Sequence, residues 1–239
     1  MKESGLRVSS RGQPVDKKGD FIKRLTADQV KVGFIGLGNM GSRIAQRLLD
    51  HGYRVSVYDR NRAQTEAVAA HGGIAAKSVL ELARSSDVVL SCLTNDEAVQ
   101  NVHTGPEGVL AGAKPGTVVL EMSTISPEDS RELHKLAAGS GVEVLDVAIS
   151  GSTPAAEQGS LTPLVGGDAA LFEAAEPIFQ DDREAILSCR RFGRGHGYEA
   201  GSSTRCWALG CKRLPRRLFW GRNLVSIAAV CSKCYQRQL

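Results

Sequence analysis

The sequence predicts a doubly wound α/β fold with a mainly parallel sheet over residues 30–180, and three observations support this prediction. Short apolar, β-favouring segments alternate with helical segments along the stretch. A glycine-rich turn, Gly36–Gly41, follows the first expected strand and opens the first expected helix. An acid, Asp59, ends the second expected strand. This order of strand, glycine turn, helix, strand and acid is typical of a Rossmann-type domain that binds a dinucleotide.

Residues 1–29 are expected to form a mobile N-terminal extension. Ser, Gly, Pro and charged residues are mixed there without a helical or strand period. The first twenty residues hold no apolar core of a secretory signal, and Glu3, Asp16 and Asp20 disfavour a mitochondrial presequence. No apolar run in the chain approaches the roughly 20 residues that cross a bilayer. We therefore expect no membrane partner and a cytoplasmic location.

The first βαβ unit is expected to begin with a strand at Val30–Ile35 and to end with a strand at Val55–Tyr58. In the turn between them, Gly36 permits a tight bend, Gly38 lets the backbone approach a pyrophosphate, and Gly41 lets helix and strand pack closely. The helix N-terminus then offers N–H groups to phosphate oxygens. We expect cofactor contacts from Gly36, Leu37, Gly38, Asn39, Met40, Gly41 and, through the ribose hydroxyls, Asp59.

The alternation continues to residue 179. Further strands are expected at 73–76, 87–93, 117–121, 142–147 and 161–165. Helices are expected at 63–71, 78–83, 127–138 and 169–179, and a further helix is expected to begin after a cap at Asn95 or Asp96; the other caps are Ser78, Ser126 and Asp168. Ligands of such sheets bind at the carboxyl ends of the strands. Here those ends are Gly36–Gly41, Asp59, Leu93–Asn95, Ser123–Thr124 and Ser150–Ser152.

Five stretches of this sequence resemble the β-hydroxyacid dehydrogenases, the family of 3-hydroxyisobutyrate dehydrogenase and tartronate semialdehyde reductase. They are VGFIGLGNMG (32–41), VYDRN (57–61), AKPGTVVLEMSTISP (113–127), LDVAISGSTPAAEQGSL (145–161) and LVGGD (164–168). The resemblance implies hydride transfer between NAD or NADP and a small 3-hydroxy acid or its semialdehyde.

The same resemblance implies roles for individual residues. Leu93, Thr94 and Thr124 would line the nicotinamide side, and Ser123, Ser150 and Gly151 would bind the substrate carboxylate. Three positions depart from the family pattern, which usually has Pro at Thr94, Pro at Ala148 and Gly at Ser152. The choice of cofactor stays open. Asp59 favours NAD because it would repel a 2′-phosphate, whereas Arg60 and Arg62 could pair with that phosphate and favour NADP.

Residues 181–239 differ in composition from the rest. They hold 12 basic and 4 acidic residues, which leaves 18 basic and 22 acidic residues before them, and they carry five of the six cysteines. The resemblance implies an all-helical second domain here, with a catalytic lysine and an asparagine four residues later. Lys212 and Lys233 stand in unrelated surroundings, so no catalytic residue is assigned, and homo-oligomerisation is expected only with an intact helical domain.

We interpret 181–239 as a basic, Cys/Arg-rich tail that is translated out of frame and poorly ordered. Shifted codons of Tyr198–Gly201 permit Met-Lys-Leu, as the family has at its lysine, and two small frameshifts near 180 and 201–203 account for several such matches. An enzyme of this kind would be inactive as it stands. The alternatives are a non-catalytic dinucleotide-binding module, or a nucleic-acid- or metal-binding protein that uses the tail. The spacing of Cys206, Cys211, Cys231 and Cys234 is weak for zinc, so neither metal nor nucleic acid is expected.

Overall fold

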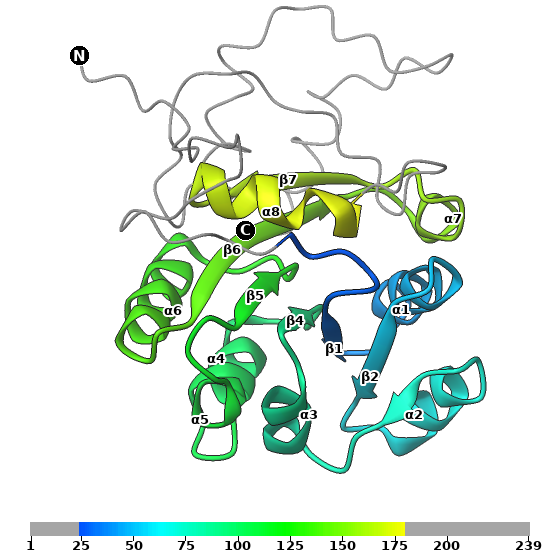
Figure 1. Ribbon diagram of the computed structural model, residues 1–239, viewed down its shortest axis with the longest axis horizontal. Helices are drawn as coiled ribbons and strands as arrows, with labels where there is room; N and C mark the ends of the chain where they lie inside the picture. The colour runs from blue at the N-terminus through cyan, green and yellow to red at the C-terminus, as the bar shows by residue number, and fades with distance from the viewer. Residues whose placement is uncertain (1–23, 180–239) are drawn as a thin grey trace, which may run out of the picture.

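The computed structural model describes residues 24–179, which form one seven-stranded sheet with helices on both faces (Figure 1). The strands lie in the order β3-β2-β1-β4-β5-β6-β7. Neighbouring strands are parallel except β6 and β7, which are antiparallel. The predicted doubly wound Rossmann-type fold is thereby confirmed.

The elements follow the expected alternation closely. The strands are β1 Lys31–Ile35, β2 Arg54–Tyr58, β3 Ile74–Ala75, β4 Val88–Ser91, β5 Val118–Glu121, β6 Glu143–Ser150 and β7 Thr162–Gly166. The helices are α1 Gly41–Asp50, α2 Arg62–Ala69, α3 Val79–Ser85, α4 Asp96–Thr104, α5 Val109–Gly112, α6 Pro127–Gly139, α7 Thr153–Glu157 and α8 Ala169–Phe179.

Alternate side chains of the strands enter two separate cores. On one face, Phe34 and Leu90 pack in a cluster with residues of α1 and α8. On the other face, Val89 and Val119 pack in a cluster with residues of α3 and α6. The central strands are therefore buried on both faces, as a parallel sheet requires, and only their ends are available to a ligand.

The helix caps that the sequence predicts are present. Ser78, Asn95 and Ser126 each accept a hydrogen bond from a backbone N–H in the first turn of α3, α4 and α6. Asp168 does the same at α8 through the N–H groups of Ala170 and Leu171. Between the two candidates for α4, Asn95 is the cap.

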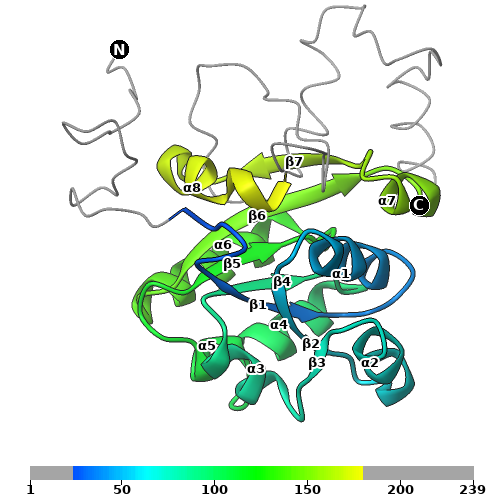
Figure 2. The same cartoon turned by 45° about the vertical axis from the view of Figure 1, so that its right-hand side comes forward.

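The packed domain begins before Val30, which corrects the expected boundary. Leu25 is buried, its N–H donates to the carbonyl of Ala174 in α8 at 2.9 Å, and its own carbonyl accepts from the Tyr53 hydroxyl at 3.0 Å. Figure 2 shows this segment running past α8 into β1. The sequence does not signal this contact, because the partner helix lies about 150 residues away.

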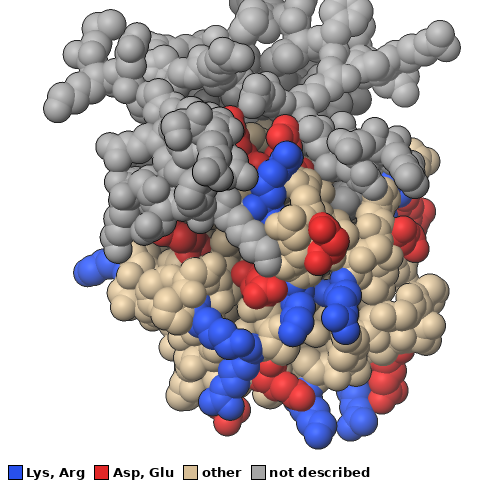
Figure 3. All heavy atoms as spheres, viewed as in Figure 1, with Lys and Arg blue, Asp and Glu red and all other residues tan. Residues whose placement is uncertain are grey.

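Some sequence-based expectations lie outside the described residues. These are the mobility of residues 1–23 and every statement about residues 181–239, including the frameshift and the cysteine-based metal site. Within 24–179, no helix is long and apolar enough to cross a membrane. On the face drawn in Figure 3, Lys and Arg side chains of the described residues lie among Asp and Glu side chains.

Candidate cofactor site

The glycine turn lies where β1 stands between β2 and β4, the point at which the strand order reverses. Gly36 has a φ of +90°, and a Cβ built on it would lie 2.3 Å from the carbonyl oxygen of Cys92 after β4. A side chain is therefore excluded twice, by backbone conformation and by space. The loops after β1 and β4 meet at this contact, which lies at the strand-order switch point where doubly wound sheets bind ligands.

The other two motif glycines differ in their surroundings. A Cβ on Gly41 would lie 1.9 Å from the carbonyl oxygen of Gly36, so α1 can start this close to β1 only without a side chain there. A Cβ on Gly38 would meet nothing within 4 Å, and Gly38 is exposed. The protein itself does not require glycine at position 38, whereas a ligand that approaches the backbone would.

The N-terminus of α1 is left open. Met40 at its N-cap makes no side-chain capping bond, and no acidic residue occupies the first turn. By contrast, side chains cap α2, α3, α4 and α6. An uncapped N-terminus of a ten-residue helix next to exposed Gly38 fits the negative charge of a pyrophosphate.

Asp59 follows β2 and holds the glycine turn in place. Its Oδ2 accepts a hydrogen bond from the Leu37 N–H, and its Oδ1 accepts one from the Asn61 N–H, both at 2.7 Å. Each oxygen keeps a second lone pair for a ribose hydroxyl. Arg60 and Arg62 are exposed, and Arg62 pairs with Glu66 at 2.9 Å. The Asp59 carboxylate is thus bonded directly to the backbone of the glycine turn.

The ends of β4 and β5 are joined by a serine. The Ser123 Oγ accepts a hydrogen bond from the Leu93 N–H at 2.7 Å, and Ser123 is buried while Leu93 is half-buried. The hydroxyl keeps its own proton as a donor toward a carboxylate. Thr94 and Thr124 are exposed beside them. The structure therefore brings the expected nicotinamide-side residues and Ser123 to one edge of the sheet.

The remaining expected carboxylate contacts lie at the end of β6. Ser150 is half-buried, and Gly151 has a φ of +150° with a Cβ position 2.6 Å from the Leu161 side chain. Glycine is thus required at 151 by the fold itself. The helix α7 that follows is tied to α1 because Arg43 pairs with Glu157 at 2.6 Å.

A buried polar cluster behind Ser123 escaped the sequence analysis. Glu121, His103 and Ser91 are all essentially inaccessible, and their side chains contact one another. The cluster unites β4, β5 and α4. The only sign of this cluster in the sequence is Glu121, an acid at the end of the apolar run VVLE. Nothing in the sequence marks His103 as the partner of Glu121.

The half-buried thiol of Cys92 lies beside this cluster. Burial first, and then the negative charge of Glu121, raise the pKa of Cys92 from 9.0 to about 11. The thiol is therefore neutral at physiological pH. Cys92 therefore offers no thiolate nucleophile, and its contribution here is the carbonyl that packs against Gly36.

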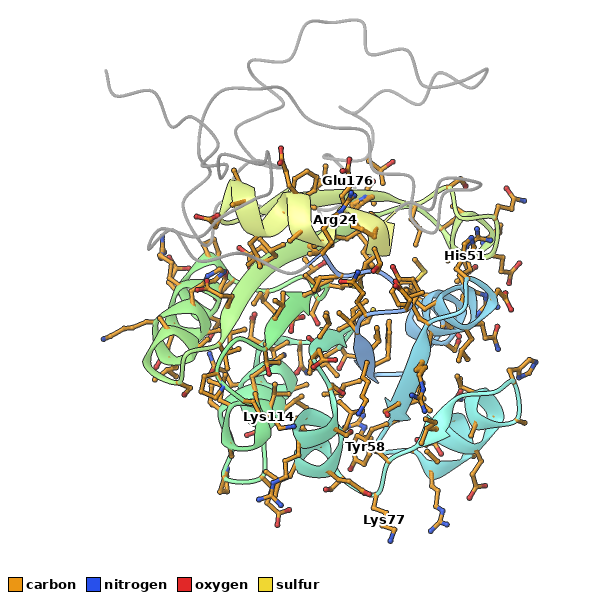
Figure 4. The ribbon with its side chains drawn as sticks, viewed as in Figure 1. Arg24, His51, Tyr58, Lys77, Lys114 and Glu176 are labelled. Carbon is orange, nitrogen blue, oxygen red and sulfur yellow. The ribbon has the colours of Figure 1, made fainter. Side chains whose placement is uncertain are left out.

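No lysine of residues 24–179 lies at the carboxyl ends of β4 to β6. Lys31 starts β1, Lys114 precedes β5, Lys135 is exposed on α6, and Lys77 follows the edge strand β3. Figure 4 shows Lys77 at the lower rim of the domain. The same residues contain no group of three or more His, Cys, Asp or Glu side chains that could hold a metal ion.

Residues 31–187 match the family model described as the NAD binding domain of 6-phosphogluconate dehydrogenase. The chain belongs to this family. Within it, the similarities point to the β-hydroxyacid dehydrogenase branch that the motifs indicate, and the described domain is its N-terminal NAD(P)-binding domain.

Three similar proteins illustrate the relationship of this NAD(P)-binding domain to that branch. The 2-(hydroxymethyl)glutarate dehydrogenase of Eubacterium barkeri is 40% identical over 62% of this chain and 50% of its own length. The NAD-dependent L-serine dehydrogenase of Pseudomonas aeruginosa is 40% identical over 63% and 50%. The solved Mycobacterium tuberculosis 3-hydroxyisobutyrate dehydrogenase with L-serine is 31% identical, with a TM-score of 0.66 over 76% of this chain and 59% of that one.

The family match covers the described NAD(P)-binding domain almost entirely. The chain spans about half the length of the first two relatives. Family membership therefore establishes the domain and its class of cofactor, while the activity of a whole enzyme is a separate matter.

Proposed function

We propose that the domain binds NAD in preference to NADP, with the dinucleotide laid across the carboxyl ends of β2, β1, β4 and β5. The observation that carries this proposal is the glycine turn, in which Gly36 and Gly41 are fixed by the fold while Gly38 is open on the side of the uncapped α1. Gly36–Gly41 would hold the pyrophosphate. Leu93, Thr94 and Thr124 would border the nicotinamide.

The preference for NAD rests on Asp59. Its carboxylate is held by the Leu37 and Asn61 N–H groups, so it cannot turn away from a ribose without breaking these bonds. A 2′-phosphate would then face a fixed negative charge. Arg60 and Arg62 are exposed side chains and compensate weakly, because surface ion pairs contribute little.

The proposed reaction is hydride transfer between the nicotinamide and a small 3-hydroxy acid or its semialdehyde. When bound, the nicotinamide supplies the hydride chemistry. The residues of this chain would orient the substrate, since the Ser123 hydroxyl, Ser150 and the Gly151 backbone lie on the neighbouring strand ends β5 and β6. The proton transfer needs an acid–base group that residues 24–179 do not supply at this edge.

Calorimetric titration of the full chain with NADH and NADPH tests the proposal. We expect binding of NADH, and binding of NADPH that is weaker by roughly tenfold. Absence of binding by both would remove the proposed function. Tighter binding of NADPH would show that Arg60 and Arg62 outweigh Asp59.

A further inference from the structure

Glu121 is a carboxylate that the fold buries almost completely. It ends β5, and its exposed fraction is 1%, while His103 on α4 and Ser91 on β4 are at 0%. Burial of an ionised carboxylate is costly unless hydrogen bonds replace its water. Such a group at the end of an apolar strand calls for a physical role.

The hydrogen bonds to this carboxylate come from β4, α4 and the residue two positions after it. Its Oε2 accepts from the Ser91 hydroxyl at 2.5 Å and lies 2.8 Å from His103 Nε2. Its Oε1 accepts the backbone N–H of Ser123 at 2.7 Å. Since His103 Nδ1 is buried without a hydrogen-bond partner, the tautomer with the proton on Nε2 leaves only a lone pair unsatisfied.

The carboxylate is connected to the edge of the sheet through Ser123. Glu121 fixes the backbone N–H of Ser123, and the Ser123 Oγ in turn accepts the N–H of Leu93. Neither bond involves the glycine turn or Asp59, which belong to β1 and β2. The hydrogen bonds of the cluster therefore reach the ends of β4 and β5 directly, and the glycine turn only through the packing of the loop after β4.

We propose that Glu121, supported by His103 and Ser91, is a positioning residue that sets the backbone of Ser123 and Leu93 for the nicotinamide end of the dinucleotide. The proposal rests on the proposed function, since it takes the binding mode across β1, β4 and β5 from there. Glu121 itself, being inaccessible, touches neither cofactor nor substrate. Its effect is confined to the nicotinamide half of the ligand and leaves the adenosine half unchanged.

Calorimetry on the full chain with two ligands separates this role from a general effect on folding. NADH carries the nicotinamide, and ADP-ribose lacks it but keeps the adenosine, the pyrophosphate and both riboses. Glu121→Gln places an NH₂ group among three donors, so one of the cluster's bonds is lost. We expect the variant to bind NADH about tenfold more weakly and ADP-ribose within about twofold of the original chain.

Two further variants complete the test. Ser91→Ala removes one bond and leaves the carboxylate with His103 and the Ser123 N–H, so a smaller loss for NADH alone is expected. Tyr53→Phe, the control, removes the hydroxyl that bonds to the Leu25 carbonyl at the amino end of the sheet, and should leave both affinities unchanged.

Several outcomes would overturn the positioning role. An equal loss for both ligands in Glu121→Gln and Ser91→Ala would show a general structural effect, and unchanged affinities would show that the cluster does not reach the site. If the original chain binds ADP-ribose and NADH equally well, the nicotinamide makes no contact with the protein. That result would rule out the positioning role of Glu121 and leave the proposed dinucleotide site intact. If it binds neither ligand, both proposals fail.

Discussion

The carboxylate of Asp59 accepts the backbone N–H of Leu37 at 2.7 Å and thereby ties the end of β2 to the glycine turn after β1. A second bond, from the Asn61 N–H, fixes the other oxygen. The acid of the motif thus orients the turn, in addition to its proposed contact with the ribose. Both effects depend on a group that only accepts hydrogen bonds.

Asp59→Asn should weaken NADH binding by about tenfold, because an amide NH₂ then faces one of the two backbone N–H groups and a donor is left unpaired. NADPH should lose less, because repulsion of the 2′-phosphate disappears with the charge. The ratio of the two dissociation constants, measured by calorimetry, reports this change. Arg62→Ala, which removes a neighbouring exposed charge, should leave NADH binding unaltered. An unchanged ratio in Asp59→Asn would contradict the assignment of cofactor preference to Asp59.

Substitutions at two glycines of the turn should separate folding from binding. Gly41→Ala places a methyl group 1.9 Å from the Gly36 carbonyl oxygen, so we expect a loss of about 2 kcal/mol or more in the free energy of unfolding. Gly38→Asp meets no protein atom within 4 Å of its Cβ and should unfold like the original chain. Its carboxylate should weaken NADH binding roughly 100-fold through repulsion of the pyrophosphate. Urea unfolding and calorimetry measure the two effects.

The matched control for the charge is Gly38→Ala, which adds a methyl group at the same place. Its NADH affinity should lie between those of the original chain and Gly38→Asp. If Gly38→Asp binds NADH as tightly as the original chain, the pyrophosphate does not lie at this turn.

Features of this fold that rest on local requirements are predictable from the sequence. Ser78, Asn95, Ser126 and Asp168 were recognisable as caps because a cap and its helix are adjacent in sequence. The central strands were recognisable because burial on both faces makes them continuously apolar.

Features that depend on distant partners were missed. Leu25 gives no sign of burial because α8, its partner, is far along the chain. The pairing of Glu121 with His103 joins a strand end to a helix 18 residues earlier, a separation without any periodic signal. β7 runs antiparallel to β6, whereas the sequence shows only another apolar segment there and carries no signal for its direction.

The thiol of Cys92 should make stability depend on alkaline pH. Its pKa is raised from 9.0 to about 11 in the folded protein, so the unfolded chain releases this proton first. The contribution of the neutral thiol to the free energy of unfolding is therefore fully present below pH 9, and it is lost as the pH rises through 11. The difference in unfolding free energy between the original chain and Cys92→Ala should shrink between pH 8.5 and 10.5. In Glu121→Gln, which lacks the neighbouring charge, the same comparison should show a smaller decline. A constant difference would contradict the raised pKa.

The chain of 239 residues should not oxidise small 3-hydroxy acids at a useful rate. General acid–base catalysis typically contributes about 10²–10⁴-fold, and none of the lysines in residues 24–179 reaches the edge that carries Ser123. Enclosure and alignment of the substrate can contribute roughly 7–11 kcal/mol more, and the described domain provides one wall only. NADH or NADPH formation from 3-hydroxyisobutyrate, D-glycerate, 4-hydroxybutyrate and L-serine measures the activity.

The control for this assay is the product of a gene in which both proposed frameshifts, near codons 180 and 201–203, are reversed. This product should regain the Lys and Asn of the family at a separation of four residues, which places them on one helical face. We expect turnover from the restored chain and cofactor binding from both. Comparable turnover in the two chains would show that another residue transfers the proton and that residues 181–239 are not out of frame. Resequencing the gene across codons 175–210 tests the frame directly, because an intact frame leaves the basic tail as a genuine part of the protein.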